Sequence, residues 1–94
     1  MTPTGSRRAA QLSGLQDADS PPELDVSAMP HVLRHPASVG AIESLAPGAA
    51  LALLCDEDPL RLLTTLRAKH GRTYRARYVQ SGPDRWRVIV WNAV

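Results

Sequence analysis

The chain has 94 residues, of which 44% are hydrophobic, and this length allows one domain rather than two. Its single cysteine excludes an intramolecular disulfide framework and favours a cytoplasmic location, and no apolar stretch reaches the ~18–20 residues of a membrane-spanning helix. The net charge of +2 is unevenly divided: residues 1–57 carry three Arg and seven acidic residues (−4), and residues 58–94 carry eight Arg or Lys and two Asp (+6).

The first 22 residues are predicted to form a disordered tail. Small and polar residues dominate this stretch, and no apolar period persists along it, so burial cannot offset the entropy lost on ordering. No apolar segment follows Arg7-Arg8, so we expect no export signal. The folded domain is therefore expected to cover residues 23–94.

The first half of this domain predicts a strand, a helix and a second strand. Residues 23–27 alternate between polar and apolar, as in a short strand, and residues 28–34 form a loop. His35-Pro36 opens a helix that Pro47-Gly48 stops. The apolar run at residues 49–54 is typical of a buried strand. The predicted buried face of the helix carries Val39, Ile42 and Leu45, with Ala41 and Ala46.

The second half predicts another helix and a β-hairpin. Asp58 is a good N-cap and Pro59 a good first helical residue, and Gly71 follows the helix as a C-terminal glycine. Residues 73–80 and 85–91 both alternate, and Ser81-Gly82-Pro83-Asp84 joins them as a turn. The apolar stripe of the helix consists of Leu60, Leu63 and Leu66, with Leu62.

The resulting order is βαβαββ. This order predicts an α/β domain of the α+β two-layer type, in which two helices cover one face of a four-stranded mixed sheet.

Four short motifs carry a resemblance to a known family: Leu24-Asp25-Val26, Arg34-His35-Pro36, the segment Asp56 to Pro59, and the segment Gly82 to Val88. Over residues 23–91 the chain resembles the TusA/SirA-like proteins, and most closely an uncharacterised "domain of unknown function" branch of them. The resemblance implies a TusA-like fold and a redox or metal-handling protein as partner. Two departures stand out. Sulfur-carrier members have Cys-Pro where this chain has His35-Pro36, and the branch has His where this chain has Glu57.

The first candidate site combines two histidines with three consecutive acidic residues. If the first two strands are parallel neighbours, both helix starts meet at one edge of the sheet. Such a set can bind a divalent metal, a metal-bearing cofactor or a partner protein, and the sequence does not identify a cofactor. Ordinary structural roles compete with this reading, because Asp58 is explained as a helix cap. The candidate ligand residues are His31, His35, Asp56, Glu57 and Asp58.

The second candidate site is a face of arginines on the final hairpin, formed by Arg75, Arg77, Arg85 and Arg87. If the helices cover the aromatic face, these side chains line the open side, where Arg72 or Trp91 extends them. Arginine beside an aromatic ring suits phosphate binding and base stacking, so RNA or another nucleic acid is the alternative ligand. A solvated, charged sheet face explains the same residues.

The third candidate is Cys55, which precedes three acidic residues. Neighbouring carboxylates raise the pKa of a thiol, so a buried structural cysteine is favoured over a sulfur carrier. No Gly-rich phosphate loop, CxxC pair or Ser/His/Asp order is present. The sequence therefore predicts an accessory binding module rather than an enzyme.

Overall fold

The computed structural model describes residues 21–94, and six elements follow in the predicted βαβαββ order. Of the predicted disordered tail (residues 1–22), residues 1–20 lie outside the described residues. Pro22, at its end, contacts the sheet: its carbonyl accepts a 2.8 Å hydrogen bond from Ala52 N–H. The elements are β1 (Glu23–Asp25), α2 (His31–Glu43), β2 (Ala50–Cys55), α3 (Leu60–His70), β3 (Tyr74–Ser81) and β4 (Trp86–Asn92).

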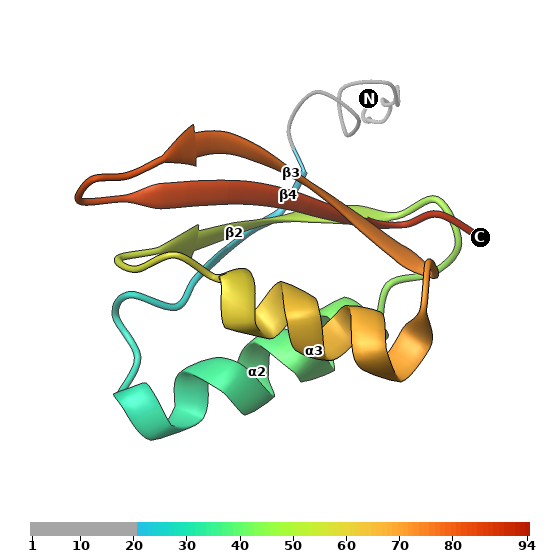
Figure 1. Ribbon diagram of the computed structural model, residues 1–94, viewed down its shortest axis with the longest axis horizontal. Helices are drawn as coiled ribbons and strands as arrows, with labels where there is room; N and C mark the ends of the chain where they lie inside the picture. Colours follow the sequence, from blue (N-terminus) through green and yellow to red (C-terminus); the bar gives the residue numbers. More distant parts are fainter. Residues whose placement is uncertain (1–20) are drawn as a thin grey trace, which may run out of the picture.

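The four strands form one mixed sheet with the spatial order β1-β2-β4-β3. The β1–β2 pair is parallel, and the β2–β4 and β3–β4 pairs are antiparallel. Both helices lie side by side against the same face of the sheet (Figure 1). The predicted fold class is confirmed. Parallel pairing of β1 and β2 places the starts of α2 and α3 at the same edge of the sheet.

The core lies between the sheet and the two helices. Alternate residues of β2 and β4 point into it, as a strand period of two requires. Each fully buried aliphatic side chain stabilises the fold by ~1.5–3 kcal/mol relative to leaving it exposed. The core residues from these strands are Leu51, Leu53, Cys55, Val88 and Val90, and the helices add Ile42, Leu62 and Leu66.

The predicted start of the first helix at His35-Pro36 is wrong, because α2 begins at His31 and holds Pro36 inside it. Pro30 precedes the helix with φ −55°, and its carbonyl accepts a 3.0 Å hydrogen bond from Leu33 N–H. A complete turn therefore forms ahead of Pro36, although proline is unfavourable within a helix. The helix also ends at Glu43, before the predicted stop at Pro47-Gly48.

The second helix begins one residue later than predicted, at Leu60 with Pro59 as its N-cap, and it ends before Gly71 as predicted. The Asp58 carboxylate accepts a hydrogen bond from Leu60 N–H at 3.0 Å, and Gly71 follows the helix with φ +62°. One predicted core residue of this helix is wrong: Leu60, in the first turn, is 61% exposed. Ala46, predicted on the buried face of the first helix, is also exposed, since it lies beyond the end of α2.

The hairpin contains one irregularity that the alternation did not reveal. The β3–β4 register shifts between Tyr78 and Gln80, which is a β-bulge that leaves Val79 without a partner on β4. Up to the bulge, Tyr74, Ala76 and Tyr78 share the helix-covered face with Val88 and Val90.

Within residues 21–94, neither helix has the length and apolar character needed to cross a membrane.

Candidate functional site

The structure brings the five predicted ligand residues to one groove of about 490 Å³ between the first turns of the two helices. We call it the helix-start groove. His31 and His35 reach it from α2, and Asp56 to Asp58 reach it from the loop between β2 and α3. Val26, Leu53 and Leu62 belong to both its wall and the core. The groove is therefore a polar opening above the edge of the hydrophobic layer.

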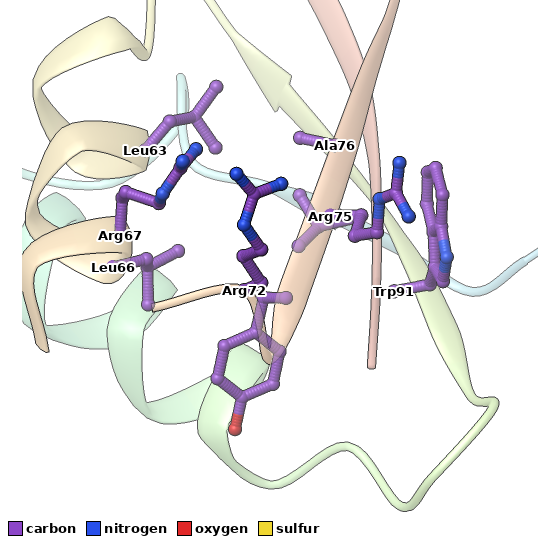
Figure 2. A pocket seen from close by; sticks show the side chains of 9 residues that line it. Leu63, Leu66, Arg67, Arg72, Arg75, Ala76 and Trp91 are labelled. Atoms are coloured by element: carbon purple, nitrogen blue, oxygen red, sulfur yellow. The ribbon is translucent and has the colours of Figure 1, made fainter. Parts of the chain in front are cut away.

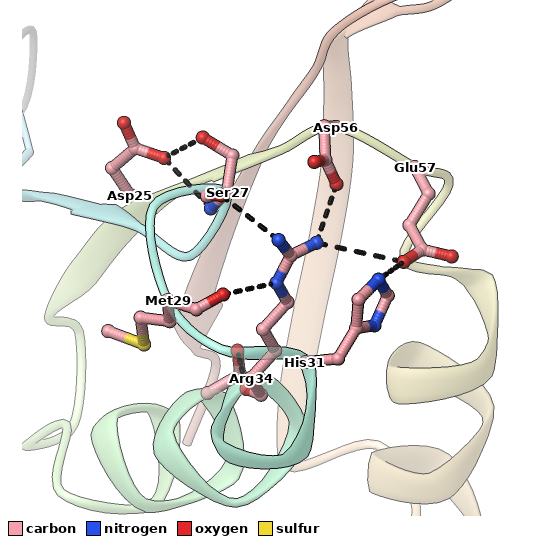
Figure 3. Close-up of polar contacts among 8 residues, drawn as sticks. Asp25, Ser27, Met29, His31, Arg34, Asp56 and Glu57 are labelled. Carbon is pink, nitrogen blue, oxygen red and sulfur yellow. Dashed lines mark hydrogen bonds and ion pairs between the residues drawn. The ribbon is translucent and has the colours of Figure 1, made fainter.

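Arg34 holds this end of the molecule together, and the sequence did not single it out (Figure 3). Its Nη1 donates a 2.7 Å hydrogen bond to Asp56 Oδ1 across the groove. Its Nε and Nη2 donate to the carbonyl oxygens of Met29 (2.9 Å) and Ser27 (3.0 Å). Only 17% of the side chain is exposed. One planar guanidinium thus joins the loop after β1, the helix α2 and the loop after β2.

The other charges are arranged around this guanidinium. Glu57 Oε2 lies 3.8 Å from Arg34 Nη1 and 3.6 Å from His31 Nε2. In the part of the chain that the structure describes, no three His, Cys, Asp or Glu side chains are placed to hold a metal ion. A guanidinium lies between the two carboxylates where a shared cation would lie. The donor set therefore fits an internal ion pair better than a metal centre.

Asp58 has two structural partners besides its place in the groove. Its Oδ1 accepts the Leu60 N–H at the start of α3 and the Tyr78 hydroxyl at 2.6 Å. Burial, followed by this hydrogen bond to Asp58, raises the pKa of Tyr78 to about 12. Asp58 thus ties β3 to the first turn of α3, and both contacts are structural.

Cys55 lies at the end of β2, where it is buried in the core and also forms part of the wall of the helix-start groove. Burial raises the pKa of the thiol to about 11, with smaller contributions from the charges of Asp56 and Glu57. Because the thiolate is the nucleophile, this thiol is a poor sulfur acceptor at neutral pH.

The four predicted arginines of the hairpin do not form one free cationic face. In the register, Arg75 is opposite Trp91 and Arg77 is opposite Ile89, on the face that the helices leave open. Arg87 is paired with Glu23 of β1. The pKa of Asp25 is lowered, first by hydrogen bonds from Ser27 and to a smaller extent by the nearby charge of Arg85. The charges of Arg85 and Arg87 are therefore partly neutralised by the acidic residues of β1.

Large apolar side chains are exposed at the same end of the molecule as the groove. Val32 is 80% exposed and Leu33 is 52% exposed in the first turn of α2, and Leu60 is 61% exposed in the first turn of α3. Leu60 was predicted as part of the apolar stripe of its helix, whereas Val32 and Leu33 fall in residues 28–34, which were predicted to form a loop.

Residues 23–92 match the model of the family DUF2249, described as "Uncharacterized conserved protein". No curated protein matches the chain, and no solved structure matches it.

Proposed function

The chain belongs to the DUF2249 family, and we propose that it acts as a non-enzymatic accessory module that binds a partner protein at the helix-start groove. The observation that carries this proposal is the exposure of Val32, Leu33 and Leu60 in the two first turns that flank the groove. None of the three lines the groove itself, but they belong to the same two helix turns as His31 and Arg61, which do. Exposed apolar side chains near a polar depression are typical of a protein-binding surface.

The charges of the groove indicate the chemistry of the partner. Asp56 and Glu57 keep 48% and 64% of their side chains exposed, although both interact with Arg34. A partner that presents an apolar anchor and a basic side chain would complement this surface. Because Arg34 already fixes both loops, the surface needs little ordering on binding, which lowers the entropic cost of association.

A binding role rather than catalysis is supported by the bonding of the polar groups. Arg34 donates to three oxygens, Asp58 accepts a helix N–H and a tyrosine hydroxyl, and the Cys55 thiol is buried. General acid–base and nucleophilic catalysis require an accessible group that can change its protonation state, which argues against such roles for these three side chains but not for the exposed His31.

The test compares capture by the full chain with capture by two variants. We expect a protein from the native cell to be retained by the wild type and lost by the double variant Leu33→Ser, Leu60→Ser, because both leucines are exposed. Val94→Ser is the matched control, since Val94 is 79% exposed at the opposite end of the molecule (Figure 1).

The purified partner then decides the matter by calorimetry. Removing two apolar anchors should weaken its affinity by about tenfold or more, whereas Val94→Ser should leave it unchanged. A partner that binds the double variant as tightly as the wild type would place the binding surface elsewhere.

The groove also defines a prediction about metal. Titration of the full chain with Zn²⁺ should give no binding heat, for the wild type and for His35→Ala alike, because Arg34 supplies the positive charge between Asp56 and Glu57. Stoichiometric zinc binding that His35→Ala abolishes would instead support a metal or metal-bearing cofactor at this site.

Nucleic-acid binding by Arg75, Arg77, Arg85 and Arg87 is the less supported alternative, because Arg87 is paired with Glu23 and Arg85 lies near Asp25.

We also propose a distant relation to the TusA/SirA-like proteins, supported by the shared βαβαββ order. Sulfur-carrier chemistry is disfavoured, since the cysteine that such proteins place before a proline is replaced by His35, and Cys55 is buried.

A further inference from the structure

A second hollow, of about 360 Å³, lies between α3 and the edge strand β3 (Figure 2). It exists because Ala76 places only a methyl group on the helix side of β3, next to Val90, while α3 contributes Leu63 and Leu66. Its size is within the ~300–1,000 Å³ of small-molecule sites. Neither its residues nor its position overlaps the helix-start groove.

Three arginines and no acidic residue line this hollow: Arg67 from α3, Arg72 from the following turn, and Arg75 from β3. Figure 2 shows Arg67 and Arg72 reaching into the space between α3 and β3, whereas Arg75 lies beside Trp91 across the strand. Within residues 21–94, neither Arg67 nor Arg72 lies within 4.0 Å of a carboxylate oxygen, so neither forms an ion pair there.

The neighbouring basic residues of α3 are bonded differently. Lys69 Nζ and His70 Nε2 both contact Glu43 Oε2, at 2.8 and 2.6 Å. The last turn of α3 therefore brings Lys69 and His70 to the carboxylate of Glu43, whereas Arg67 has no carboxylate partner within residues 21–94. The carboxyl end of α3 adds roughly half a negative charge nearby, which is less than the two full positive charges of Arg67 and Arg72.

We propose that Arg67 and Arg72 form a binding site for a small organic phosphate whose apolar or aromatic body lies against Leu63, Leu66 and Ala76. Guanidinium groups bind phosphate oxygens in pairs, and two of them match the charge of a phosphate monoester. The apolar wall explains why the ligand carries more than the phosphate, since inorganic phosphate alone would leave that wall in contact with water.

The full chain is titrated with adenosine 5′-monophosphate, with adenosine and with inorganic phosphate, and backbone amide shifts are followed by NMR. We expect the monophosphate to shift amides of residues 63–76 and to bind more tightly than the other two. Arg67→Gln and Arg72→Gln should each weaken binding by about tenfold or more, since each removes a charge-assisted contact.

Arg77→Gln is the matched control, because it removes the same charge from an exposed position of β3 that does not line the hollow. It should change the affinity less than twofold. Equal weakening by Arg77→Gln would reveal unspecific attraction to the basic half and overturn the site. So would adenosine binding as tightly as the monophosphate, or no shift with either phosphate compound. None of these results bears on the helix-start groove.

Discussion

Arg34 is the residue that most directly links the sequence to the geometry of the helix-start groove. Its side chain makes hydrogen bonds to Ser27, Met29 and Asp56, which belong to two loops that are far apart in the sequence. Two of these acceptors are partly buried carbonyls, which would lose their partner without Arg34. A single side chain thus sets the width of the groove.

Arg34→Met should lower the free energy of unfolding by about 2 kcal/mol, because it keeps the apolar stem and removes all three hydrogen bonds. Arg34→Lys should recover only part of this loss, since an ammonium group lacks the fork geometry. Urea denaturation measures both variants. Arg77→Met, at an exposed position, should stay within about 0.5 kcal/mol of wild type. A similar loss in Arg77→Met would assign the effect to net charge.

Cys55 shows how burial decides the chemistry of a residue. Its thiol lies in the core cluster, and its pKa is raised to about 11. A thiol with this pKa is protonated at physiological pH and reacts slowly with electrophiles.

The rate of Cys55 alkylation by iodoacetamide should therefore rise about tenfold per pH unit between pH 7 and 10 without levelling off, because the thiolate fraction keeps growing below pH 11. The chain unfolded in guanidinium chloride is the control, and its rate should level off near pH ~8.5–9. A plateau near pH 7 in the folded protein would indicate an activated thiol and reopen sulfur transfer.

At the scale of the elements, the ends of the helices show where sequence signals act locally. Gly71 ends α3 with φ +62°, a conformation that residues with a side chain rarely adopt. Gly40 lies within α2, where a residue with a side chain is preferred. A Cβ added to either residue would meet no atom within 4 Å. The two glycines therefore isolate backbone effects from packing.

Gly71→Ala should destabilise the fold by about 1–2 kcal/mol, because alanine in the left-handed region is strained. Gly40→Ala should stabilise it by about 0.5–1 kcal/mol, because alanine loses less backbone freedom on folding. Thermal denaturation followed by circular dichroism measures both changes. Shifts of the same sign would contradict the assigned backbone conformations.

At the scale of the whole molecule, Glu43 joins the two helices. It lies at the end of α2, and its carboxylate contacts Lys69 and His70 at the end of α3. These contacts, with the Lys69 hydrogen bond as the largest, lower the pKa of Glu43 from its ordinary value of 4.5. Since the folded-state pKa is depressed, the stabilisation is present above pH 4.5 and is lost as the pH falls through the folded value.

Glu43→Gln should therefore be less stable than wild type at pH 7, and this difference should shrink as the pH falls below 4.5. Urea midpoints at pH 7 and pH 3 measure it. Asp84→Asn, which removes an exposed acid in the hairpin turn, is the matched control and should show no such pH-dependent difference. A Glu43→Gln deficit that stays constant with pH would assign it to packing rather than charge.

The sequence by itself determined the element order and most of the core. Alternation defined the strands, the spacing of three and four marked Ile42 and Leu66 as buried, and Asp58 and Gly71 marked the ends of α3. These signals are local, because backbone periodicity and capping depend on neighbouring residues alone. The acidic and histidine residues of the groove could be placed at one edge once β1 and β2 were taken as parallel.

Only the tertiary structure decided what those residues contact. Arg34 lies 22 positions from Asp56, and no periodicity relates the two. The first turn of α2 formed ahead of Pro36 because contacts from Pro30 and Arg34 outweigh the local preference of the proline. Leu60 is exposed although it continues the apolar stripe, and Arg67 faces a hollow because Ala76 leaves space beside α3. Such outcomes depend on packing between segments that are distant in the sequence, and local sequence patterns do not reveal this packing.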